Sequence, residues 1–181
     1  MNKKVILMIL DGWGKSPDPK VSAIDNANIP FINSLYKNYP SAQLRTDGLN
    51  VGLPEGQMGN SEVGHMNLGA GRIVYQDLAK INLAVANNTL AKEQVLVDAF
   101  TYAKANNKKV HFLGLVSDGG VHSHTSHLRG LINATQQHGL QKVFVHAFTD
   151  GRDVDPKSGK QYIQDLQNYI ANTTVKLASV V

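Results

Sequence analysis

A single serine, Ser61, stands where a glycine-rich loop gives way to a short predicted helix. The loop, residues 47–59, contains four glycines and a proline, and residues 59–65 read GNSEVGH. The start of a helix presents unpaired backbone N–H groups and a partial positive charge, so it favours an anion. A Ser61 hydroxyl at this position can act as a nucleophile that becomes phosphorylated, with its new charge stabilised. The alternative is that Asn60 or Ser61 is only a helix cap.

Asp11 directly follows the apolar run at residues 5–10, which contains β-branched residues and reads as a strand buried on both faces. A carboxylate held at the end of a rigid strand is a common ligand of a divalent cation. Such a cation would lower the pKa of a serine hydroxyl and neutralise a phosphate. The alternative is an aspartate that only caps a turn at Gly12. One carboxylate cannot make a metal site, because these cations take several ligands.

Three histidines alternate with hydroxyl residues at positions 122–127, where the sequence is HSHTSH. Zinc binding is one interpretation, because His124 and His127 can share a helical face, but the motif supplies no thiolate or carboxylate partner. We favour contact of His122 with a phosphate or hydroxyl group. His124 and His127 are then surface or helix-start residues.

Arg152 and Asp153 form an adjacent pair with a clear chemical use. Arginine binds phosphate or carboxylate through two parallel hydrogen bonds, and an aspartate accepts hydrogen bonds from sugar-like hydroxyl groups. The alternative is a surface ion pair in a turn. The position of the pair after an apolar run, like that of His122, favours a ligand-binding role.

The elements that would position these residues follow from the apolar pattern. After a break near Tyr75, strands and helices alternate at a spacing typical of parallel strands with right-handed crossovers. Polar motifs follow the carboxyl ends of the first three predicted strands, the edge at which open α/β sheets bind ligands. The predicted strands are residues 5–10, 110–116, 143–148 and 175–181, and the predicted helices include 128–138 and one opened by a Ser158–Gln161 capping box.

Composition excludes several classes of function. The chain has 181 residues, is 42% hydrophobic and has a net charge of +4, so it can bury a core. Its basic residues are dispersed, whereas nucleic-acid binding favours a dense basic stripe. It has no cysteine, which excludes disulfides and thiolate chemistry. No segment has the length of a membrane span or a signal core. We expect a cytoplasmic protein with a small-molecule substrate and no nucleic-acid or membrane partner.

Taken together, four segments resemble motifs of the cofactor-independent phosphoglycerate mutases, the family that does not require 2,3-bisphosphoglycerate. The motifs are individually specific and span almost the whole chain. They are residues 9–14, ILDGWG; residues 52–65, GLPEGQMGNSEVGH; residues 117–124, SDGGVHSH; and residues 146–153, HAFTDGRD.

The resemblance implies a parallel-sheet α/β protein with an alkaline-phosphatase-like metal domain that is interrupted by an inserted phosphoglycerate-binding domain. Residues 1–75 would be the first piece of the metal domain, and residues 76–181 the first part of the inserted domain. Both would be incomplete, because members of the family are considerably longer. We therefore expect an N-terminal fragment that is inactive alone, and a monomeric full-length enzyme.

The same resemblance implies interconversion of 3-phosphoglycerate and 2-phosphoglycerate, the step shared by glycolysis and gluconeogenesis. Ser61 would form a phosphoserine, and Asp11 and Ser61 would bind a pair of divalent metal ions. Manganese is expected first, with magnesium or cobalt as alternatives. His122, Arg152 and Asp153 would contact the substrate.

Two other functions remain open from the residues alone. The first is a phosphatase or phosphopentomutase-like enzyme of the same metal-dependent superfamily, with the same serine chemistry. It would release free phosphate from phosphoglycerate instead of isomerising it. The second is a module, built on the strands after residue 110, that binds a small phosphorylated acid without catalysis.

Overall fold

The computed structural model describes residues 3–181, and the chain divides into two compact units, Met1–Tyr75 and Gln76–Val181. The division falls at the residue where the sequence pattern changes. It separates the segment that contains Asp11 and Ser61 from the segment that contains His122, Arg152 and Asp153.

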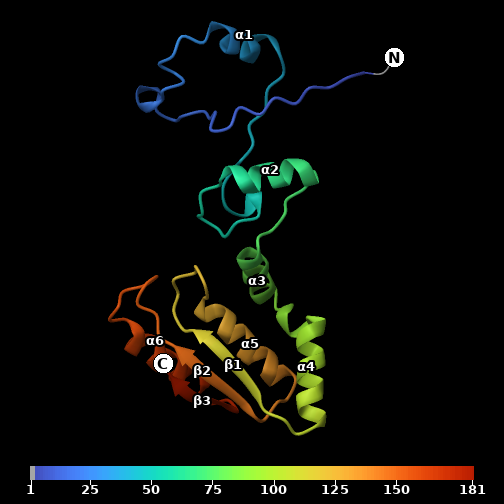
Figure 1. The fold of residues 1–181 in the computed structure, drawn as a ribbon, viewed down its shortest axis with the longest axis vertical. Helices are drawn as coiled ribbons and strands as arrows, with labels where there is room; N and C mark the ends of the chain where they lie inside the picture. The colour runs from blue at the N-terminus through green and yellow to red at the C-terminus, as the bar shows by residue number, and fades with distance from the viewer. Residues whose placement is uncertain (1–2) are drawn as a thin grey trace. The chain divides into compact units, whose positions relative to one another are not determined.

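The second unit is built on a parallel sheet, which confirms the predicted α/β class. Within the described residues the sheet has three strands in the order β1-β2-β3 (Figure 1). Two helices, α5 and α6, make the crossovers between successive strands. The strands are β1 (Val110–Leu115), β2 (Val143–Phe148) and β3 (Val175–Val180), and the helices are α5 (Thr125–Gln137) and α6 (Gly159–Ile170).

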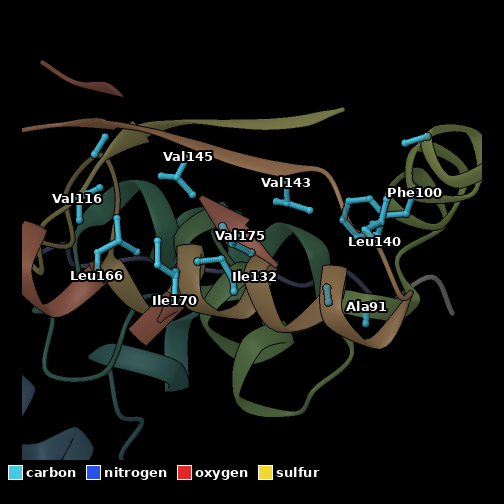
Figure 2. Close-up of a cluster of buried hydrophobic side chains, with 13 residues drawn as sticks. Ala91, Phe100, Val116, Ile132, Leu140, Val143, Val145, Leu166, Ile170 and Val175 are labelled. Carbon is cyan, nitrogen blue, oxygen red and sulfur yellow. The ribbon is translucent and has the colours of Figure 1, made fainter. Parts of the chain in front are cut away.

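The core of this unit lies between one face of the sheet and the two crossover helices. Alternate residues of a strand point to the same face, so Val143, Val145 and Ala147 of β2 are buried together. They pack against Ile132 of α5 and Leu166 of α6 (Figure 2). Burial of each large aliphatic side chain contributes about 1.5–3 kcal/mol. The core therefore fixes β1 and β2, and with them the loops that follow these strands.

A helical segment precedes the sheet and is tied to α5 by polar contacts. It comprises α3 (Asp77–Ala86), η3 (Leu90–Lys92) and α4 (Gln94–Ala105). The side chain of His127 in α5 bonds to Asn82 in α3, and His138 Nε2 lies 2.9 Å from the carbonyl oxygen of Ala91. Only the Nε2–H tautomer of His138 can donate to that carbonyl.

The first unit consists of short helices and loops. Its helical elements are η1 (Pro19–Val21), α1 (Pro30–Asn38), η2 (Gly48–Val51) and α2 (Ser61–Ala70). A small core of Val51, Leu53 and Val63 joins η2 and the loop after it to α2.

The strand predicted at residues 5–10 was wrong, because this segment has no regular secondary structure. Val5 and Ile6 are 90% and 89% exposed. A parallel strand needs neighbouring strands to pair its N–H and C=O groups and cover its side chains. Residues 3–181 supply no such neighbour for this run.

The predicted capping box at the start of α6 was also wrong. Ser158 is the N-cap, but its hydroxyl donates to the carbonyl oxygen of Asp155 and caps no amide of the helix.

Among the described residues, no helix is both long enough and apolar enough to cross a membrane.

Candidate functional site

Ser61 is the first residue of α2, and its neighbour Asn60 is the N-cap. The side-chain oxygen of Asn60 accepts a hydrogen bond from the N–H of Val63 at 3.0 Å. The question left open by the sequence, which of the two residues caps the helix, is thereby answered. The Ser61 hydroxyl is exposed and does not serve as the N-cap, so it is available for chemistry at the positive end of the helix dipole.

One turn further along α2, His65 contacts Ser61 twice. His65 Nδ1 lies 2.8 Å from the carbonyl oxygen of Ser61 and 3.1 Å from its hydroxyl oxygen. A carbonyl oxygen can only accept, so Nδ1 carries the proton in this arrangement. The same N–H then faces the hydroxyl oxygen as a donor. His65 is therefore placed to stabilise negative charge on Ser61 and not, in this tautomer, to remove its proton.

Gly59 fixes the approach of the loop to this helix. A Cβ atom built on Gly59 would lie 1.7 Å from the carbonyl oxygen of Thr46, so only glycine lets the two backbone segments come this close. Asn67 of α2 adds a second tether, because its amide donates to the carbonyl oxygen of Val51 at 3.0 Å. The loop and helix therefore hold Ser61 in one place relative to η2.

Asp11 and Ser61 line the same cavity of the first unit, which has a volume of about 390 Å³. Other residues of its lining include Gly12, Thr46 and His65. Gly12 has a φ of +74°, a conformation that favours glycine, and it turns the chain directly after Asp11. The cavity thus brings together the two residues that were predicted to bind metal.

The oxygen donors of Asp11 and Ser61 suit hard divalent cations such as Mn²⁺ and Mg²⁺. Two such donors are only part of the ligand set that these ions require. Residues 3–181 contain no group of three or more His, Cys, Asp or Glu side chains arranged to hold a metal ion. The described residues therefore fit part of a metal site.

In the second unit, the loops after β1 and β2 bring His122 and Asp153 together. His122 Nε2 lies 3.8 Å from Asp153 Oδ2, and the two side chains are 59% and 14% exposed. This contact is an ion pair only when the histidine is protonated. Arg152 is exposed beside Asp153. All three predicted substrate contacts thus lie on the loops at the carboxyl edge of the sheet.

Beneath these residues lies a buried pair, Ser117 and Asp150, that sequence reasoning did not assign. Ser117 donates from Oγ to Asp150 Oδ2 at 2.6 Å, and the residues are 1% and 6% exposed. The hydrogen bond from Ser117, followed by those from the amides of Asp153 and Arg152, lowers the pKa of Asp150 below its ordinary value. The register of β1 and β2 in the structure accounts for this pair. Leu115 pairs with Phe148, and the two polar residues each come two positions later.

The loop after β1 is also bound to α6 through Asp118 and Tyr162. The phenol of Tyr162 donates to Asp118 Oδ1. This hydrogen bond, with a smaller effect of burial, raises the pKa of Tyr162 above its ordinary value. Nothing in the sequence spacing indicates this contact of Tyr162 with a residue 44 positions away.

His124 and His127 have roles in the fold. His124 is the N-cap of α5, where its Nδ1 accepts from the N–H of Ser126 at 3.1 Å. The helix therefore starts at Thr125, three residues before the predicted start. Burial, followed by the charge of His124, lowers the pKa of His127 below its ordinary value. His127 bonds to Asn82 of α3, and its ring centroid lies 5.8 Å from that of His124.

The chain is similar to known proteins along its whole length. Residues 81–181 match the family model of the N-terminal region of BPG-independent phosphoglycerate mutases. The chain is 88% identical over all 181 residues to 2,3-bisphosphoglycerate-independent phosphoglycerate mutase of Flavobacterium johnsoniae, and 53% identical to that of Parabacteroides distasonis. It spans 36% of the length of each of these relatives.

A solved structure described as phosphoglycerate mutase of Leishmania mexicana, at low cobalt concentration, matches 95% of this chain with a TM-score of 0.60 and 30% sequence identity. The match covers 33% of that longer chain. The family model covers more than half of the present chain, and the relatives are similar along all of it. The chain therefore belongs to the 2,3-bisphosphoglycerate-independent phosphoglycerate mutase family.

Proposed function

We propose that the protein containing this chain interconverts 3-phosphoglycerate and 2-phosphoglycerate, a step of glycolysis and gluconeogenesis, through a phosphoserine at Ser61. One observation carries the proposal. In a chain of this family, Asn60 and not Ser61 caps helix α2, and Ser61 lines the same cavity as Asp11. A phosphatase would have the same serine chemistry, so the products distinguish the two activities.

The reaction requires two displacements at phosphorus. In the first, the Ser61 oxygen loses its proton and forms a bond to the substrate phosphorus, while the bond to the glycerate oxygen breaks and that oxygen gains a proton. In the second, the other glycerate hydroxyl loses its proton and its oxygen forms a bond to the phosphorus of the phosphoserine, while the bond to the Ser61 oxygen breaks and that oxygen regains a proton. The positive end of α2 and the N–H of His65 stabilise charge on Ser61 in both steps.

Asp11 and Ser61 would hold part of a pair of divalent metal ions, with manganese proposed first and magnesium or cobalt as alternatives. When bound, the ions supply a lowered serine pKa and neutralise charge on the transferring phosphoryl group. The remaining donors would come from residues outside 3–181, since the relatives are longer. For this reason we also propose that the 181-residue chain is inactive alone.

His122, Arg152 and Asp153 would bind the phosphoglycerate. Arg152 suits a carboxylate or phosphate, and Asp153 accepts from a glycerate hydroxyl. Retention of the glycerate between the two displacements is what separates a mutase from a phosphatase, because an empty site admits water. Fixed hydrogen bonds of this kind would hold the glycerate between the two displacements.

A chimera tests the proposal: residues 1–181 are joined to the remaining residues of the Flavobacterium johnsoniae relative. We expect 2-phosphoglycerate to form from 3-phosphoglycerate, and mass spectrometry to find phosphate on Ser61 after rapid quenching. Ser61→Ala should abolish both, whereas Ser34→Ala, at a half-buried serine of α1, should leave both unchanged. Free phosphate as the main product would support a phosphatase instead. Turnover by residues 1–181 alone would contradict the inactive fragment.

A further inference from the structure

One buried carboxylate organises the loop that carries both Arg152 and Asp153. Asp150 Oδ1 accepts hydrogen bonds from the backbone N–H groups of Arg152 at 3.0 Å and Asp153 at 3.1 Å. Its other oxygen, Oδ2, accepts from the hydroxyl of Ser117 at 2.6 Å. The carboxylate therefore fixes the backbone of two adjacent residues from within their own loop.

Ser117 connects this carboxylate to the rest of the fold. Its carbonyl oxygen accepts from the N–H of Thr125 at 2.8 Å, which ties the pair to the start of α5. Its hydroxyl oxygen lies 3.4 Å from the N–H of Gly119 in the loop that leads to His122. A shift of Ser117 or Asp150 would thus move the loops after both β1 and β2.

Burial makes this arrangement costly to disturb. Ser117 and Asp150 are 1% and 6% exposed, so water cannot easily replace a lost partner. A carboxylate with three donors, two of them from the backbone, has few alternative orientations. The lowered pKa of Asp150 agrees with a carboxylate that stays charged in this position.

We propose that Ser117 and Asp150 are a positioning pair, which sets the backbone of Arg152 and Asp153 for contact with the glycerate part of the substrate. The inference rests on the proposed mutase function, and it adds two residues that touch no substrate. The hydrogen bond from Ser117 holds the carboxylate of Asp150 in one orientation. That carboxylate holds the backbone amides of Arg152 and Asp153, and the backbone positions of these two residues determine where their side chains can reach.

The proposal has a chemical consequence that a general loss of stability lacks. If Arg152 and Asp153 lose their fixed positions, glycerate escapes from the phosphoserine form of the enzyme before the second displacement. Water then attacks the phosphorus of the phosphoserine. A bond forms between the water oxygen and phosphorus, the bond between phosphorus and the Ser61 oxygen breaks, a proton passes from the water to that oxygen, and free phosphate leaves. The ratio of free phosphate to 2-phosphoglycerate therefore measures how well the phosphoserine form of the enzyme retains glycerate.

The test compares variants of the chimera described above. Asp150→Ala removes all three hydrogen bonds, and Ser117→Ala removes one. Asp150→Asn keeps an oxygen for the two amides, while its new amide group can donate to Ser117. The matched control is Asp155→Ala, because exposed Asp155 also accepts a backbone N–H, that of Lys157 at 2.8 Å, in the same loop.

We expect Asp150→Ala to raise both KM and the ratio of free phosphate to 2-phosphoglycerate by about tenfold or more. Ser117→Ala should raise both quantities by about threefold. Asp150→Asn should restore values near those of the unchanged chimera, and Asp155→Ala should not differ from it. In the 181-residue chain, hydrogen exchange followed by NMR should show that Asp150→Ala removes protection of the Arg152 and Asp153 amides.

Results of three kinds are distinguishable. An unchanged chimera without mutase activity would overturn the proposed function and this inference with it. An active chimera in which Ser117→Ala and Asp150→Ala behave like Asp155→Ala would overturn the inference alone. If Asp150→Ala does not fold, Ser117→Ala decides the question through the phosphate ratio and the amide protection, measured at a temperature where both proteins are folded.

Discussion

A Cβ atom built on Gly119 would lie 2.9 Å from the Cβ atom of Asp153 and 3.2 Å from its carbonyl oxygen. Real Cβ atoms essentially never approach another atom within 3.0 Å. The loops that follow β1 and β2 therefore meet at a point where only a hydrogen atom fits. The contact brings the backbone of one loop against the residue that we propose as a substrate ligand.

Gly119→Ala should push these two loops apart. We expect a loss of about 1–3 kcal/mol in the free energy of unfolding, as for an overpacked core position. Urea unfolding of the 181-residue chain, followed by circular dichroism, measures this change. Gly114→Ala in β1 is the control, because a Cβ there would meet nothing within 4 Å. Equal stability of the two variants would show that the loops can separate without cost.

The contact between Tyr162 and Asp118 predicts an alkaline transition. The hydrogen bond to Asp118 raises the pKa of Tyr162 above its ordinary value of 10.0, because it stabilises the neutral phenol. The raised pKa means that this stabilisation is fully present below pH 10 and is lost as the pH rises through the pKa of the folded state.

Ultraviolet titration of the phenolate absorbance, as a difference between the protein and Tyr162→Phe, isolates this one tyrosine. We expect its midpoint above pH 10, and Asp118→Asn should lower that midpoint. A midpoint at the ordinary value in the unchanged protein would mean that the hydrogen bond does not persist in solution.

The sequence was sufficient to predict the sheet of the second unit, for a physical reason. Each apolar run from residue 110 onward finds its neighbours within the same 72 residues, because β1, β2 and β3 pair only with one another in the described chain. The apolar pattern of each strand and the strands that pair with it therefore lie within the same stretch of sequence. The run at residues 5–10 has an equally apolar pattern but no partner within residues 3–181, so pattern alone predicted a strand wrongly.

The residues of the candidate site also differ in whether the sequence alone could predict them. Ser61, Asp11 and the loop residues were proposed because each follows an apolar run or precedes a helix, and because the motifs that contain them resemble those of the family. The positions of Ser117 and Tyr162 depend on tertiary contacts, and a hydroxyl bound to a carboxylate 33 positions away leaves no local pattern. Similarly, the hydroxyl of Ser158 donates to the carbonyl oxygen of Asp155, a contact that the spacing of a capping box does not indicate.

The carboxylate of Asp150 predicts an acid-dependent loss of stability. Hydrogen bonds from Ser117 and from two backbone amides lower its pKa below the ordinary value of 3.8. A lowered pKa means that the stabilisation is present above pH 3.8 and is lost as the pH falls through the pKa of the folded state.

Urea unfolding of the protein and of Asp150→Asn at a series of pH values tests this dependence. The protein should be the more stable of the two near neutral pH, and the difference should decrease as the pH falls below 3.8. A difference that does not vary with pH would mean that the carboxylate charge contributes nothing.

His127 predicts a second acid-dependent loss of stability. Burial against α3, followed by the electrostatic effect of His124, lowers the pKa of His127 below its ordinary value of 6.5. Protonation is therefore resisted in the folded state, so the stabilisation exists above pH 6.5 and is lost as the pH falls through the lowered pKa.

NMR titration of the imidazole C–H signals measures this pKa directly, with His127→Gln used to assign the signal. Replacement of His124 by glutamine removes the smaller of the two causes, so the pKa of His127 should rise only part of the way toward 6.5. A full return to 6.5 in that variant would show that charge, and not burial, holds the imidazole neutral. An imidazole packed between α3 and α5 must lose hydration, whatever the charge of its neighbour. A full return to 6.5 would therefore also mean that His127 stays open to water despite its contact with Asn82.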